Sequence, residues 1–190
     1  MSLLTAGCVP VSETYLEPSA PGGRLGPYRA ACGGAPDYIT FSPSNFDWID
    51  VRFSAILPSK SISRQLVIKM YINKNIPHEF LLFPSAKAQR ERAAQYNAMR
   101  DQPIAITAAS GTARISWANG GNAALPLTFL DGDNDAILNG WITWTENVPD
   151  FTGDWFLLES PALSFDGVWL ELPPIRFERS EGIFAAPINC

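Results

Sequence analysis

Two stretches of the chain alternate between apolar and polar residues, which is the pattern of a β-strand with one buried face. Residues 48–57 place one set of side chains on an apolar face and the other on a polar face: Ile49, Val51, Phe53 and Ala55 against Asp50, Arg52 and Ser54. Residues 65–72 alternate in the same way. A chain with such segments has to cover the apolar face of a sheet, so a β-rich fold follows.

Further short apolar runs between turn residues extend this pattern over residues 37–190. We count roughly ten strands bounded by Pro and Gly, a spacing typical of a sandwich or a barrel. The sequence predicts an all-β protein, an antiparallel β-sandwich of immunoglobulin-like or jelly-roll-like type. Residues 104–108 and 112–117 flank Ala109-Ser110-Gly111, which predicts a hairpin turn between two of these strands.

One segment departs from the β pattern. Residues 85–100 are rich in Ala, Gln, Arg and Lys, which favour a helix. Ser85 is a suitable N-cap, and Pro103 limits the far end. We therefore expect one short helix inserted between strands. Its basic residues suit either an anionic-ligand patch or, more simply, a solvated helix face.

Composition excludes several classes of function. Nearly half of the residues are apolar, whereas charged residues make up 17% and the net charge is -5. Nucleic-acid binding requires clustered Lys and Arg, so we expect no nucleic-acid partner. The sequence holds no apolar run of about 20 residues, the length that a membrane-spanning helix requires.

The N-terminal part of the chain has a different composition from the rest. Residues 9–36 contain five Pro and five Gly, which favours an extended or irregular chain. We therefore divide the sequence into residues 1–8, a tether over residues 9–36, and a β-sandwich domain over residues 37–190.

The beginning and end of the chain resemble small uncharacterised lipoproteins of Gram-negative bacteria. The resemblance rests on Thr5-Ala6-Gly7-Cys8, on the Pro/Gly-rich segment and on the ending Ala186-Pro187-Ile188-Asn189-Cys190. It implies that residues 1–8 are the remnant of a signal and that Cys8 carries the lipid anchor. With Val9 after the cysteine, it also implies a periplasmic protein held at the outer membrane. A basic region and an apolar region before Cys8 are missing, and the alternative is an ordinary cysteine near a flexible terminus.

Lipidation of Cys8 would leave Cys32 and Cys190 as a pair. In an oxidising periplasm these two residues could form a disulfide that ties the last residue to the start of the domain. The alternative is a free thiol at a frayed C-terminus. Zinc is not expected, because the three cysteines lack C-x-x-C spacing.

The sharpest local motif is Asp131-Gly132-Asp133-Asn134-Asp135. Carboxylates at alternate positions can converge on calcium, so Asp131, Asp133 and Asp135 form a weak candidate metal site. The match to a calcium loop then fails, because Ala136 and Ile142 stand where that loop needs Gly and Glu. A plain acidic turn between strands explains the motif without a cofactor.

Tryptophans suggest a second kind of site. Trp141, Trp144 and Trp155 lie close together in the sequence and could stack on sugars. The competing interpretation is that they fill the core, where aromatic residues are common.

Catalysis has little support in the sequence. His78 is the single histidine, and no nucleophile elbow accompanies it. We therefore predict a non-enzymatic envelope lipoprotein with a structural or binding role toward an envelope protein or a glycan. The alternatives are a carbohydrate-binding module and a glycosidase with paired carboxylates, for which Asp150, Asp154, Glu159, Asp166 and Glu171 are candidates.

Overall fold

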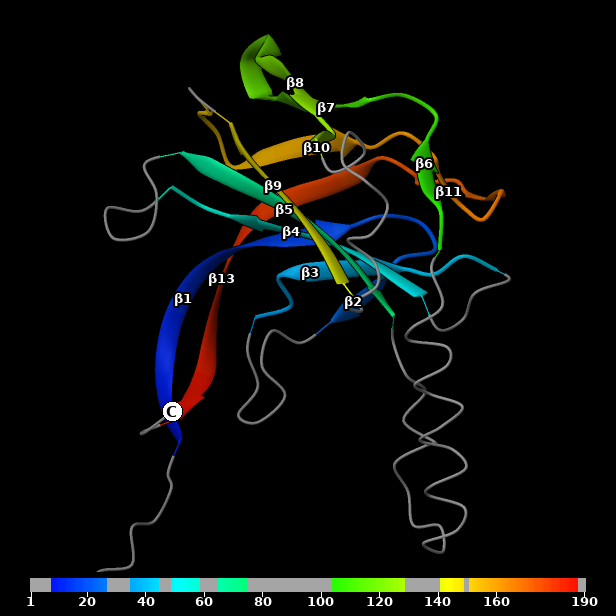
Figure 1. The fold of residues 1–190 in the computed structure, drawn as a ribbon. Helices are drawn as coiled ribbons and strands as arrows, with labels where there is room; N and C mark the ends of the chain where they lie inside the picture. The colour runs from blue at the N-terminus through cyan, green and yellow to red at the C-terminus, as the bar shows by residue number, and fades with distance from the viewer. Residues whose placement is uncertain are drawn as a thin grey trace, which may run out of the picture.

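A computed structural model describes residues 8–26, 35–44, 49–58, 65–74, 104–128, 141–148 and 151–187. Within these ranges the chain forms thirteen antiparallel strands and no α-helix. The strands make three sheets that do not close into a barrel, as Figure 1 shows. The predicted all-β sandwich is therefore confirmed. The helix expected at residues 85–100 lies outside the described residues.

The first sheet has five strands in the order β1-β13-β10-β7-β8. Their bounds are Cys8–Ser19 for β1, Ile175–Pro187 for β13, Trp155–Glu159 for β10, Thr112–Trp117 for β7 and Asn122–Pro126 for β8. A short 3-10 turn, Ala118–Gly120, joins β7 to β8. The first and last strands of the described chain are thus neighbours.

The second sheet has the order β2-β3-β4-β5-β9. Its strands are Arg24–Gly26 for β2, Tyr38–Phe41 for β3, Ile49–Ile56 for β4, Leu66–Lys74 for β5 and Trp141–Val148 for β9. Strands β2 to β5 follow one another as a meander, which the strand order of immunoglobulin domains does not contain. A third sheet of three short strands has the order β12-β11-β6, with bounds Val168–Leu170, Leu163–Phe165 and Ile106–Ala108.

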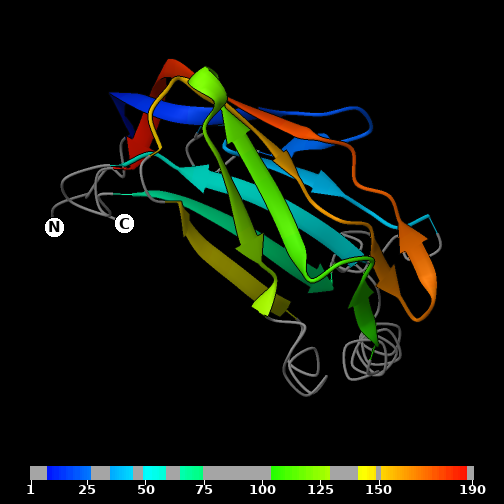
Figure 2. The ribbon, with the colours of Figure 1, turned by 90° about the horizontal axis from the view of Figure 1, so that it is seen from above.

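The core lies between the two five-stranded sheets, which Figure 2 shows stacked as two layers. The apolar face predicted for residues 48–57 is buried, as are the apolar residues of β5 that pair with it. From the other sheet, Phe156 and Phe177 stack with ring centroids 4.7 Å apart. Alternation along β4 and β5 therefore identifies the inner face of the second sheet.

The hairpin predicted around Ala109-Ser110-Gly111 is wrong. Strand β6 pairs with β11, whereas β7 pairs with β8 and β10. The Ala109 N–H donates to Ala162 O, and the Leu127 N–H donates to Gly111 O. The segment therefore carries the chain from the three-stranded sheet to the first five-stranded sheet.

The tether predicted for residues 9–36 is also wrong where the structure describes it. Residues 8–19 form β1, residues 24–26 form β2, and the domain does not begin at residue 37. The prolines misled the prediction, because Pro10 and Pro18 lie in an edge strand, where a missing N–H breaks no ladder. Pro21 and Gly22 form the turn between the two strands.

Beyond Glu178, β13 continues with β1 as its one described neighbour. We call the paired segments Cys8–Thr14 and Glu181–Pro187 the ribbon; Figure 1 shows it curving away from both sheets. An isolated two-stranded ribbon is marginally stable in water. Here the Phe184 ring lies over Gly182, where an added Cβ atom would come within 2.4 Å of the ring. The Phe184 and Tyr15 rings also pack edge to face, with their centroids 5.5 Å apart. These contacts brace the ribbon from the side of the body.

Candidate functional site

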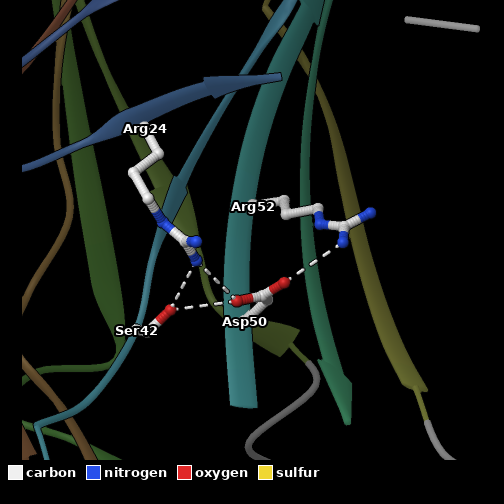
Figure 3. Close-up of polar contacts among 4 residues, drawn as sticks. All are labelled: Arg24, Ser42, Asp50 and Arg52. Carbon is white, nitrogen blue, oxygen red and sulfur yellow. Dashed lines mark hydrogen bonds and ion pairs between the residues drawn. The ribbon is translucent and has the colours of Figure 1, made fainter. Parts of the chain in front are cut away.

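A cluster of polar side chains centres on Asp50 in β4. Its side chain is 3% exposed although it lies on the face of the second sheet that points away from the core. The Ser42 hydroxyl donates to Asp50 Oδ1 at 2.9 Å, and Arg24 Nη2 donates to the same oxygen at 3.2 Å and to Ser42 Oγ at 3.0 Å. Arg52 Nη2 donates to Oδ2 at 3.1 Å. Figure 3 shows the side chains of Arg24, Ser42 and Arg52 converging on the carboxylate.

Sheet register explains how these residues meet. Thr40 of β3 pairs with Arg24 of β2 on one side and with Arg52 of β4 on the other. Asp50 and Arg52 are two residues apart in β4, so their side chains share a face. The carboxylate therefore links β2, β4 and the residue that follows β3.

Charge balance indicates what this cluster does. Two guanidinium groups surround one carboxylate, and Arg24 remains 68% exposed while Arg52 is 31% exposed. The Arg52 guanidinium also lies over the Tyr38 ring, 5.4 Å from its centroid. A buried carboxylate with this set of donors acts as a structural clamp, because its oxygens already accept hydrogen bonds that a ligand would otherwise supply.

Asp37, just before β3, is the second unusual carboxyl group. Its Oδ1 is buried and finds no hydrogen-bond partner in the described structure. Burial, with a smaller contribution from the Glu13 carboxylate, raises the pKa of Asp37 from 3.8 to about 6. A carboxyl group of this kind is a candidate proton donor near neutral pH.

Of the five carboxylates considered for glycosidase chemistry, three have a partner in the described structure, Glu171 is exposed, and Asp150 lies outside the described residues. Glu159 pairs with Arg114 at 3.4 Å, and Asp154 pairs with Arg179 at 3.2 Å. Asp166 Oδ1 accepts a hydrogen bond from the Ala105 N–H at 2.8 Å. These interactions assign the three side chains to surface pairs and a turn.

The predicted tryptophan site separates into different environments. Trp144 is 2% exposed, and its Nε1 donates to Pro126 O at 2.9 Å, so it is a core residue and not a stacking platform. Trp155 is half-buried, and the Arg176 guanidinium lies 4.4 Å from its ring centroid. Trp141 begins β9 opposite Asn73.

The predicted cysteine and metal sites are only partly within the described residues. Cys8 is the first residue of β1 and pairs with Pro187. Cys32, Cys190, Asp131, Asp133 and Asp135 lie outside the described residues. Among the residues that are described, no group of three or more His, Cys, Asp or Glu side chains could hold a metal ion.

Comparison with known proteins adds no relative. No family model, no curated protein and no solved structure matches the chain. The residues of the chain itself therefore have to carry any functional argument.

Sequence reasoning did not find the Asp50 cluster or Asp37. Asp50 and Arg52 stood on the predicted polar face of β4, which was a usable signal. Arg24, however, lies in the segment interpreted as a tether, and its contact with Asp50 spans 26 residues. Only the pairing of β2 with β3 reveals it.

We expect Asp50→Ala to lower the free energy of unfolding by about 3 kcal/mol, because it leaves two cations around a buried site without their anion. The matched variant Arg24→Ala should cost less than about 1 kcal/mol, since this guanidinium is mostly exposed. Urea unfolding measures both variants. Equal losses would contradict the assignment of Asp50 as the centre of the clamp.

We also expect an unusual pH dependence from Asp37. Because its pKa is raised in the folded state, the folded chain holds this proton more tightly than the unfolded chain, and stability falls as pH rises from about 4 through about 6. Asp37→Asn should remove this fall, whereas substitution of an exposed carboxylate, Asp154→Asn, should retain it. Urea unfolding at a series of pH values is the measurement, and a wild-type slope in Asp37→Asn would refute the account.

Proposed function

We propose that this chain is a non-enzymatic cell-envelope lipoprotein with a structural or binding role. It is exported, carries its lipid on Cys8 and is held at the periplasmic face of the outer membrane. Cys32 and Cys190 form its disulfide. The partner is an envelope protein or a glycan.

The position of Cys8 supports this proposal. It is the first residue of β1, at the outer end of the ribbon and far along the strand from Leu16, which is fully buried. A lipid attached there would lie beyond the folded body and would displace no core side chain. The part of the chain that the structure describes includes no helix that could span a membrane.

The engagement of the acidic residues supports a non-enzymatic role. Asp50, Asp154, Glu159 and Asp166 all accept hydrogen bonds or form ion pairs that join strands or fix turns. These contacts favour structural roles for the four carboxylates, whereas a glycosidase would need two carboxyl groups facing each other across a cleft.

The intact mass of the protein, expressed from its natural gene and extracted from membranes, tests the anchor. We expect a mass that includes acyl groups, and we expect the Cys8→Ser protein to lack that added mass. Cys32→Ser is the matched control and should keep it. A native mass without acyl groups, or an unchanged acyl mass in Cys8→Ser, would refute the anchor.

A further inference from the structure

The outer end of the ribbon is free of charge. Register pairs residues 8–12 with residues 183–187, from Cys8 opposite Pro187 to Ser12 opposite Ile183. None of these ten residues is acidic or basic, and eight of them are Val, Ile, Phe, Ala or Pro: Val9, Pro10, Val11, Ile183, Phe184, Ala185, Ala186 and Pro187. Charge begins only at Glu13 and Glu181, nearer the body. The ribbon therefore has an uncharged end and an acidic base.

At this end Pro10, Ser12 and Ile183 are exposed, whereas Phe184 is half-buried. Ile183 is 77% exposed, the highest value among the exposed large apolar residues of the described chain. Burial of such a side chain away from water is favourable. The ribbon is also too narrow to cover it, because two strands offer no second layer. Something outside the described chain has to cover this end if the apolar surface is to be buried.

A lipid surface fits this end better than a polar partner does. The end offers no charge to a polar partner, and the two glutamates at its base would remain in water. Both long edges of the ribbon carry peptide groups, which need hydrated surroundings and would not enter the hydrocarbon. The headgroup region, where amphipathic segments insert by about 5–10 Å, satisfies both requirements.

We propose that the uncharged end of the ribbon lies in the interfacial region of the bilayer, so that β1 and β13 form a stiff support for the sandwich. This inference rests on the proposed function, because the lipid on Cys8 would leave the chain at the same end. Ile183 is the described side chain that enters the interface. The body then stands off the membrane by the length of a paired ribbon and not by a flexible tether.

Partition of the full chain onto vesicles tests the contact separately from the lipid. The Cys8→Ser protein, which has no acyl groups, is floated with zwitterionic phosphatidylcholine vesicles at low and high salt. We expect measurable, salt-independent partition, because burial of apolar surface drives it. Adding Ile183→Asp should weaken partition about tenfold, whereas adding Leu25→Asp, which alters another exposed apolar residue, should leave it unchanged. Circular dichroism confirms that each variant is folded.

Failure of the inference is distinct from failure of the anchor. Absence of partition by Cys8→Ser, or equal partition of the Ile183→Asp and Leu25→Asp proteins, overturns the ribbon contact even if the native mass includes acyl groups. A dimer in solution that Ile183→Asp dissolves would assign this end to a second copy of the chain and would also overturn it. A native mass without acyl groups overturns the anchor alone.

Discussion

The pairing of β1 with β13 is the constraint on which the rest of the structure depends. Every residue of β1, from Cys8 to Ser19, has a partner in β13. This pairing makes the N-terminal segment an edge strand of the first sheet and delivers Leu16 to the core. It also leads the chain directly into β2, which brings Arg24 to the clamp at Asp50. Contacts between residues so distant in sequence close a large loop, which costs conformational entropy and is typical of slowly folding proteins.

Asp50 in β4 and Asp37 before β3 are two carboxyl groups with different surroundings. Asp50 is almost completely buried, and it is surrounded by a hydroxyl and two guanidinium groups. Asp37 is less buried, and one of its oxygens lacks a partner in the described structure. The first arrangement holds a charge in place, while the second favours the protonated form. A single sheet thus contains both a fixed ion pair and a group sensitive to pH.

Local pattern was sufficient for the strands that alternate and insufficient for those that do not. Strand β3 and most of β4 and β5 could be predicted, because one face of each is continuously apolar. Strand β1 could not be predicted in this way. Its prolines are tolerated because the strand lies at the edge of its sheet, and a position at the edge is a property of the sheet and not of the segment. The clamp at Asp50 was missed because its partner Arg24 lies in β2, within the segment interpreted as a tether.

The most direct test of the account is amide hydrogen exchange of the full chain, followed residue by residue with NMR. If the ends of the chain pair as described, alternate amides of Cys8–Ser19 should exchange slowly, together with alternate amides of residues 179–187, where β1 is the one described neighbour of β13. Exchange of all β1 amides at the rate of an unfolded chain, with β4 still protected, would show that the N-terminal segment is a tether after all and would contradict the account.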